Sequence, residues 1–179
     1  MGIEHAAPGR LGSAVSAADH EEPDWNAVYR DQLPRLYNYV RFRLGGDADA
    51  EDVTSRTFEK AWQARARYRS DIAGFSAWLF GIARHVLADH LRQRRSHLPL
   101  EVAEALPAGA TPEEDALHGS NLAHLARLTG DLPERERELI ALKYGAELNN
   151  RMIARLTGLS ESNVGTILHR VVQRLRERW

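Results

Sequence analysis

The sequence contains no cysteine among its 179 residues. Without thiols the chain has no disulfide bonds, no cysteine-ligated zinc or iron–sulfur site and no thiol nucleophile. It also lacks any apolar run approaching the roughly 20 residues that a membrane-spanning helix needs. The first 22 residues show no basic start followed by an apolar block, so no secretory signal is predicted. We therefore expect a cytoplasmic protein with no direct membrane insertion.

Patterns typical of catalysis, cofactors and metals are also missing. Eight histidines are present, but no pair has zinc-site spacing on one helix face. His85 and His90, for example, are five residues apart, which places them about 140° apart around a helix. The sequence has no glycine-rich phosphate loop and no nucleophile elbow. We predict a protein that is not an enzyme and that has no catalytic residue, cofactor or bound metal.

The charge of the chain is segregated, although its net value is only −1. Residues 24–97 carry thirteen Lys or Arg against nine acids, and residues 119–179 carry ten against seven. Residues 98–118, between them, carry five acids and no base. Two basic blocks separated by an acidic one suggest two modules that each meet a polyanion. Ordinary solvated helices joined by an acidic linker would produce the same pattern.

The periodicity of apolar residues indicates an all-α protein, because no stretch alternates convincingly as a strand would. We predict a disordered tail at 1–23, a first helical domain at 24–97, a flexible acidic linker at 98–118 and a second helical domain at 119–179. The tail is rich in Ala, Gly and Ser without an apolar period, and the linker combines prolines with acids. The fold is therefore expected to consist of two small helical domains.

The first domain is predicted to hold three helices. The first should end at Gly45, and Pro34 should either kink it or mark a start inside it. The second should begin near Asp47 or Asp49, where acids favour a helix N-terminus. The third should begin near Phe75 and end in a basic stretch.

Two helical segments are expected to precede the most distinctive motif of the second domain. One covers roughly 119–128. The next begins at residues 131–134, where Asp131 should act as the cap and Glu134 should reach back to it.

The most specific pattern in the chain is a helix-turn-helix at 150–169. Ala154 is the small residue where the two helices cross. Gly158, four residues later, tolerates positive φ in the turn, and Val164, six residues beyond, is the apolar residue inside the second helix. Ser160 can cap that helix. A plain helical hairpin with a glycine turn remains the alternative.

A helix-turn-helix places the N-terminal side chains of its second helix against base edges in the major groove. Asn163 and Glu161 have the hydrogen-bonding chemistry for adenine and cytosine edges, respectively. The candidate DNA-binding residues of this helix are Ser160, Glu161, Ser162, Asn163, Thr166, His169 and Arg170.

At this point the residues resemble a known family. The stretches Asp49–Val53 and Phe75–Arg84 resemble region two of bacterial sigma factors. The C-terminal stretch from Leu132 through Arg170 and on to Arg176 resembles their region four. Two such domains with no third between them resemble the extracytoplasmic-function (ECF) subfamily. The resemblance implies a promoter-specificity subunit that binds bacterial core RNA polymerase and promoter DNA at the minus-ten and minus-thirty-five elements. It also implies control by an anti-sigma factor.

By the same resemblance, the helix at 51–62 is the one that docks on the polymerase clamp helices. The residues assigned to core polymerase binding are Glu51, Asp52, Ser55, Arg56 and Glu59. The loop at 68–74 and the third helix resemble the part that reads the minus-ten element, where a base is held outside the stack. The minus-ten candidates are Arg69, Ser70 and Asp71 in the loop and Arg84, His85, Arg92 and Arg95 on the helix.

Some features leave other interpretations open. Trp62 and Trp78 could stack on bases, but both lie on apolar stripes, which favours core packing. In the family that the chain resembles, basic residues often occupy the two outward positions held here by Gly165 and Ile167. A smaller phosphate footprint at the minus-thirty-five element is therefore expected. A helix-turn-helix regulator that acts without being a polymerase subunit is the main alternative function. An interaction protein that offers its apolar faces to a helical partner is another.

Overall fold

The computed structural model describes residues 24–45, 47–70, 74–97, 124 and 127–179. Every regular element in these ranges is helical, which confirms the predicted all-α class. The elements are α1 (Trp25–Leu44), α2 (Asp47–Gln63), the short η1 (Arg65–Arg67), α3 (Phe75–His97), α5 (Glu134–Ile140), the π-helical turn η2 (Ala141–Gly145), α6 (Asn150–Thr157) and α7 (Glu161–Glu177). The predicted tail at 1–23 and linker at 98–118 lie outside the described residues.

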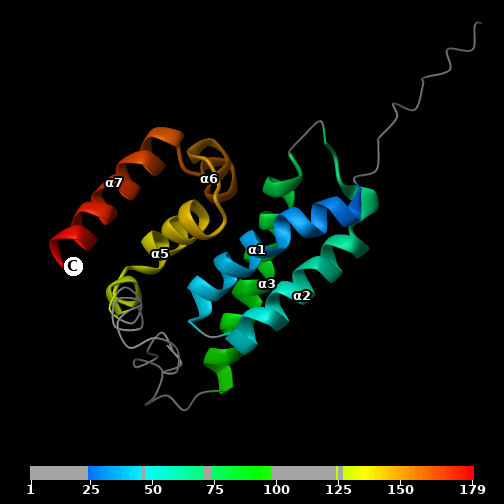
Figure 1. The fold of residues 1–179 in the computed structure, drawn as a ribbon, viewed down its shortest axis with the longest axis horizontal. Coiled ribbons are helices and arrows are strands. Elements are labelled where there is room, and N and C mark those ends of the chain that lie inside the picture. Colours follow the sequence, from blue (N-terminus) through cyan, green and yellow to red (C-terminus); the bar gives the residue numbers. More distant parts are fainter. Residues whose placement is uncertain (1–23, 46, 71–73, 98–123, 125–126) are drawn as a thin grey trace, which may run out of the picture.

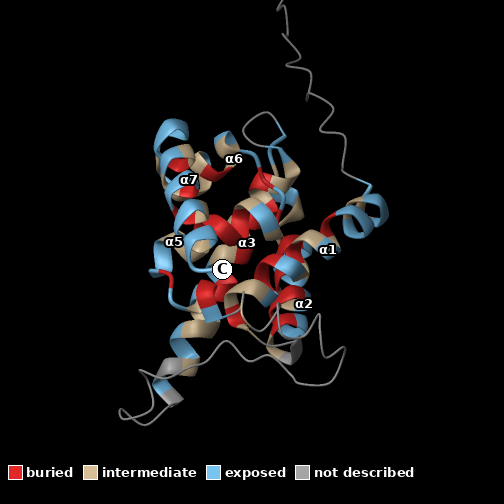
Figure 2. Cartoon of the chain, turned by 60° about the vertical axis from the view of Figure 1, so that its left-hand side comes forward, coloured by how far each residue is buried: buried red, intermediate tan, exposed pale blue. Residues whose placement is uncertain are grey.

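The helices form two groups, one of α1–α3 and one of α5–α7 (Figure 1). In the first group α2 packs against both α1 and α3. In the second, α7 packs against α5 and α6. The two groups also touch, because α1 lies against η2 and α3 against α6. Figure 2 shows buried residues on the facing sides of these helices and exposed residues on their outer sides.

The first helix begins at Trp25, well before Pro34. The Asp24 side chain caps it by accepting from the backbone N–H groups of Asn26 and Ala27. Gly45 ends it in the left-handed conformation with φ 70°, as expected for a glycine after a helix. Pro34 does not start the helix but lies inside it on the exposed side. The missing N–H of Pro34 therefore leaves the buried face of α1 intact.

The predicted cap at Asp131 is wrong. Helix α5 begins at Glu134 with Pro133 in the cap position, and no side chain bonds to that end. Asp131 lies too far upstream to cap, and its carboxylate instead accepts from Arg178 Nη2 at 2.8 Å. Residues 127–130 are helical, so the segment expected at roughly 119–128 extends two residues further, and most of its earlier part lies outside the described residues.

One continuous hydrophobic core runs through both groups of helices. The first group contributes its largest buried side chains from α1 and α3, and the second contributes aliphatic side chains from α5, η2, α6 and α7. The largest fully buried members include Leu36, Tyr39, Leu79, Phe80, Leu139, Leu142 and Ile153. Burial of this apolar surface is the main force holding both groups in place.

Candidate nucleic-acid interface

Helices α6 and α7 form the predicted helix-turn-helix. Gly158 makes the turn with φ 73°, which only glycine adopts at little cost. The Ser160 hydroxyl caps α7 by accepting from the backbone N–H of Asn163 at 3.2 Å. Val164 and Ile153 are fully buried where the two helices meet. The positions that the sequence assigned to turn, cap and core all have these roles.

The outward face of α7 carries a polar stripe. Ser162, Thr166, His169 and Gln173 follow one another at spacings of four, three and four residues, so they share one side of the helix. All four are exposed, and the buried Val164 lies on the opposite side. The structure thus brings three of the predicted DNA-binding residues together and adds Gln173, which the sequence reasoning missed.

Two of the predicted base readers do not lie side by side. Glu161 and Asn163 are two residues apart on α7, which separates their directions by about 160° around the helix. The Glu161 carboxylate lies 3.6 Å from Arg151 Nε of α6, so it faces the other helix of the motif. Asn163 and Arg170 are exposed on the flank of the polar stripe. Direct base contact by either Asn163 or Glu161 stays a prediction.

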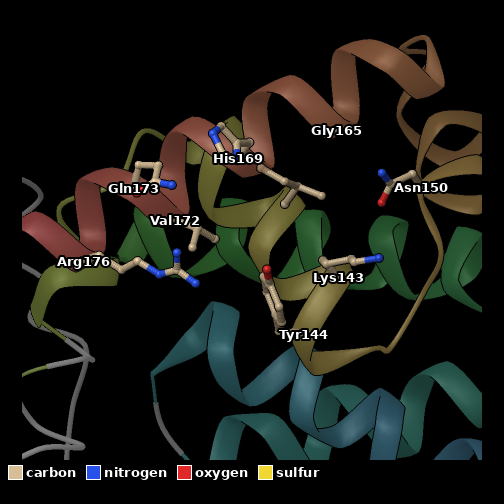
Figure 3. A pocket seen from close by; sticks show the side chains of 9 residues that line it. Lys143, Tyr144, Asn150, Gly165, His169, Val172, Gln173 and Arg176 are labelled. Atoms are coloured by element: carbon tan, nitrogen blue, oxygen red, sulfur yellow. The ribbon is translucent and has the colours of Figure 1, made fainter.

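A hollow of about 250 Å³ opens beside the polar stripe, between α7, η2 and the start of α6 (Figure 3). Cationic side chains come from both sides, with Lys143 on η2 and Arg176 on α7, and no carboxylate lines it. Asn150 reaches it from the first turn of α6, and Tyr144, 60% exposed, forms its edge. Lys143 lies next to α7 only because η2 packs there in the folded chain. Its position in the sequence, far from the helix-turn-helix motif, therefore gave no indication that it belongs to this site.

The five residues expected to bind core polymerase lie together on α2. Glu51, Asp52, Ser55 and Glu59 are exposed on the side opposite the buried Val53. Arg56, on the same helix, pairs with Asp52 at 3.4 Å. The outer face of α2 is therefore a polar, largely acidic surface with a well-packed helix behind it.

The residues expected at the minus-ten element are more scattered. Arg69 and Ser70 are exposed, whereas Asp71 lies outside the described residues. His85 is exposed on α3, and its Nδ1 lies 2.7 Å from the carbonyl oxygen of Gly81. Arg92 is exposed and pairs with a carboxylate one turn away. The side chain of Arg95 is outside the described part.

Arg84 faces in another direction. Its Nε donates to Glu138 Oε1 of α5 at 2.7 Å, and its Nη1 donates to the carbonyl oxygen of Leu156 in α6. Its side chain is only 29% exposed. The Arg84 guanidinium is therefore bound by residues of α5 and α6. It does not lie with the other residues that were predicted to bind the minus-ten element.

The two tryptophans differ in their surroundings. Trp78 is partly buried among aromatic rings, with ring centroids 5.1 Å from Tyr68 and 5.3 Å from Phe75. Trp62 is 49% exposed, so the expectation of core packing was wrong for this residue. It lies in the last turn of α2, where its ring forms a T-shaped pair with that of Trp25, with the ring centroids 5.2 Å apart.

Comparison of this chain with known proteins identifies the family to which it belongs. The model of Sigma-70 region 2 matches residues 28–97, and that of Sigma-70, region 4 matches residues 130–177. The ECF RNA polymerase sigma factor SigL of Mycobacterium tuberculosis (strain ATCC 25618 / H37Rv) is 32% identical over 171 residues, covering 93% of this chain and 94% of SigL. This chain belongs to the ECF sigma factors. Region two comprises α1–α3, and region four comprises α5–α7.

Other ECF sigma factors show a similar level of identity. BldN of Streptomyces coelicolor is 31% identical over 170 residues, which cover 93% of this chain and 64% of BldN. This chain therefore spans less than two thirds of the length of BldN. ShbA of Streptomyces griseus is 32% identical over 154 residues, covering 80% of this chain and 81% of ShbA.

Two solved structures share the fold of this ECF sigma factor. RpoE in complex with the anti-sigma factor NepR from Bartonella quintana superposes with a TM-score of 0.72 at 20% identity, covering 87% of this chain and 96% of that one. CnrH in complex with the cytosolic domain of CnrY gives 0.62 at 24% identity, covering 85% and 84%. Among the described residues, no helix has the length and apolar character needed to cross a membrane.

Proposed function

We propose that this ECF sigma factor is a promoter-specificity subunit that binds bacterial core RNA polymerase and directs it to minus-thirty-five and minus-ten elements. It acts by binding, and the polymerase supplies the chemistry. The observation that carries the proposal is a complete helix-turn-helix in region four joined, in one chain, to the exposed acidic face of α2 in region two. A sigma subunit works where transcription occurs, so we place it in the cytoplasm.

Helix α7 is the element that enters the major groove at the minus-thirty-five position. Its polar stripe of Ser162, Thr166, His169 and Gln173 faces base edges, with Asn163 and Arg170 on the flank. Lys143 and Arg176 in the adjoining hollow neutralise phosphates of one strand. These two cations partly replace the basic residues that are missing at Gly165 and Ile167.

Region two holds the polymerase and the minus-ten element. The acidic face of α2 docks on the core enzyme, and the exposed loop residues Arg69 and Ser70 meet the displaced base. The exposed His85 and Arg92 of α3 lie along the path of the strand, where a basic groove would neutralise its backbone.

An anti-sigma factor is a further proposed partner. RpoE and CnrH, which share this fold, were each solved in a complex, RpoE with an anti-sigma factor and CnrH with the cytosolic domain of CnrY. A regulator of this kind would keep both promoter-binding regions away from the polymerase.

Co-elution with core RNA polymerase on a sizing column tests the proposed function. We expect stoichiometric binding by the full chain, and its loss when Glu51 and Glu59 on α2 are both changed to Arg. Glu177→Arg, an exposed charge reversal on α7, is the matched control and should leave co-elution unchanged. Failure of the full chain to bind, combined with tight binding to duplex DNA alone, would favour the regulator that acts without polymerase.

A further inference from the structure

One residue of α1 contacts both ends of the loop that joins α2 to α3. Trp25, the first residue of α1, packs its ring against Trp62 in the last turn of α2, with the ring centroids 5.2 Å apart. The same ring lies 5.6 Å from that of Phe75, the first residue of α3. Both pairs are T-shaped, so the positive edge of one ring meets the negative face of the other. Trp25 therefore bridges the two ends of this loop.

A second set of ring contacts holds the loop from inside. The Tyr68 ring, within the loop, has its centroid 5.4 Å from that of Phe75 and 5.1 Å from that of Trp78. Phe75 and Trp78 of α3 are themselves 5.3 Å apart. Because Phe75 contacts both Trp25 and Tyr68, the rings form one continuous cluster from the start of α1 into the loop.

The stretch from α2 to Tyr68 is ordered by short-range hydrogen bonds. Arg65 Nη1 donates to the carbonyl oxygen of Trp62 at 2.9 Å, and Arg65 Cζ lies 4.2 Å from the centroid of the Trp62 ring, a cation–π contact. The backbone N–H of Arg67 donates to the carbonyl oxygen of Ala64 at 2.9 Å. That of Tyr68 donates to the carbonyl oxygen of Arg65 at 3.0 Å. The chain therefore leaves α2 along a defined turn that ends at the Tyr68 ring contacts.

Two exposed candidates for the minus-ten element follow directly after these contacts. Arg69 and Ser70 come next in the chain after Tyr68, so the position of the Tyr68 ring sets where their backbone begins. A loop that is already ordered before it meets a DNA strand loses less conformational entropy on binding than a loose one. The ring cluster therefore favours binding of the strand through the loop that it holds.

Trp25 makes these contacts with its ring alone. Its Nε1 is buried and has no hydrogen-bond partner within the described residues. Tyr29, one turn further along α1, differs from it, because its ring is 48% exposed and lies 4.7 Å from that of Phe58 in α2. Tyr29 thus packs α1 against α2 one turn before Trp62, whereas Trp25 packs α1 against both ends of the loop.

We propose that Trp25 is a positioning residue for recognition of the minus-ten element. Its ring, shared between Trp62 and Phe75, holds the loop in the shape that presents Arg69 and Ser70 to the displaced strand. Without this ring the loop samples other shapes, and only a fraction of the molecules is ready to bind. The proposal rests on the proposed function, because it concerns the same DNA strand.

A single-stranded probe tests this role in the holoenzyme. The probe is a fluorescent oligonucleotide with the non-template strand of a minus-ten element, taken from a promoter that the wild-type holoenzyme selects from random-sequence DNA. If the fraction of loops in the binding shape falls to about a tenth, Trp25→Ala should bind the probe about tenfold more weakly. Co-elution with core polymerase and binding to a duplex minus-thirty-five fragment should not change. Equal loss of all three would overturn the proposal, because Trp25 would then only stabilise the fold.

Two further variants separate the ring contacts of Trp25 from the general packing of α1. Trp25→Phe keeps an aromatic ring and loses no hydrogen bond within the described residues, so it should restore most of the binding to the probe. Tyr29→Ala is the matched control, since it removes an aromatic ring from the same helix away from the ends of the loop, and it should bind the probe like the wild type. A loss in Tyr29→Ala as large as that in Trp25→Ala would overturn the proposal.

Hydrogen exchange in the free protein tests the ring contacts without DNA or polymerase. In Trp25→Ala the backbone amides of Arg67 and Tyr68 should exchange faster, toward the rate of unprotected amides, while that of Thr57 within α2 keeps its protection. Unchanged exchange at Arg67 and Tyr68 would overturn the proposal.

The same measurements distinguish failure of this proposal from failure of the proposed function. Core binding by the wild type, together with unchanged affinity of Trp25→Ala for the single-stranded probe, would refute the positioning role and leave the function intact. Absence of core binding by the wild type would refute the proposed function, whatever the exchange rates of the loop.

Discussion

Regions two and four present their predicted functional side chains in opposite ways. In region four the residues assigned to DNA lie on the exposed side of α7, with Val164 buried behind them. In region two Arg84 turns away from solvent toward Glu138, and Trp62, expected inside, is half exposed. An apolar pattern marks which face of a helix is buried. It does not tell which neighbour covers that face or whether a charged residue at its edge meets water or another domain.

The two regions differ in how far apart in the sequence the interacting residues lie. The helix-turn-helix is complete within about 20 residues, and its turn, cap and core positions act on their immediate neighbours. The contact between the two regions joins residues 54 to 112 positions apart, from the pair of Arg84 and Glu138 to that of Arg35 and Glu147. Local rules therefore suffice for region four but not for the contact between the regions.

The largest effect is expected on the stability of the helix-turn-helix, and it tests whether the two regions fold independently. Val164→Asp places an unpaired carboxylate in the core of the helix-turn-helix, which should cost about 3–5 kcal/mol. Hydrogen exchange should then show loss of amide protection in α6 and α7, while α2 retains its protection. The matched control is Thr166→Asp, two residues later on the exposed face, which should leave protection unchanged. Equal loss in α2 would show that one cooperative unit spans both regions.

An intermediate effect should distinguish the two candidate base readers of α7. Asn163→Ala should reduce discrimination at the minus-thirty-five element by about 1–3 kcal/mol, the range for a bidentate base contact. Glu161→Ala should change it by less than about 1 kcal/mol, because Glu161 faces Arg151 in an exposed pair. Competition between promoter fragments for the holoenzyme measures both. The reverse order of effects would mean that α7 enters the groove turned about its axis.

The smallest effect concerns the buried Tyr39 at the contact between the regions. Burial raises the pKa of its hydroxyl above the ordinary value. The unfolded chain loses this proton above about pH 10 whereas the folded chain keeps it, so stability should fall as the pH rises beyond that point. Tyr39→Phe should change stability at pH 7 by no more than about 1 kcal/mol, because the hydroxyl has no hydrogen-bond partner among the described residues.

Urea unfolding of the wild type and Tyr39→Phe at about pH 7 and about pH 10.5 measures this difference. The variant should lose less stability between the two pH values than the wild type. Tyr144→Phe, which alters an exposed tyrosine, should behave like the wild type. If Tyr39→Phe loses as much stability as the wild type, another group is responsible for the alkaline sensitivity.

The amino-acid sequence by itself determined those features that depend on a residue and its near neighbours. Gly45 and Gly158 end helices because they adopt positive φ at little cost, and Ser160 caps α7 because its hydroxyl reaches an N–H three residues on. Even here the rule failed at Asp131, where Pro133 took the cap position. The family resemblance came from the same local motifs.

The tertiary structure alone decided how distant helices meet. It placed Lys143 beside α7, turned Arg84 toward Glu138 and set Gly145 against the backbone of Tyr39. Each of these depends on the mutual position of helices whose residues are far apart along the chain. That position is set by the shape and burial of whole helix faces and not by the spacing of a motif.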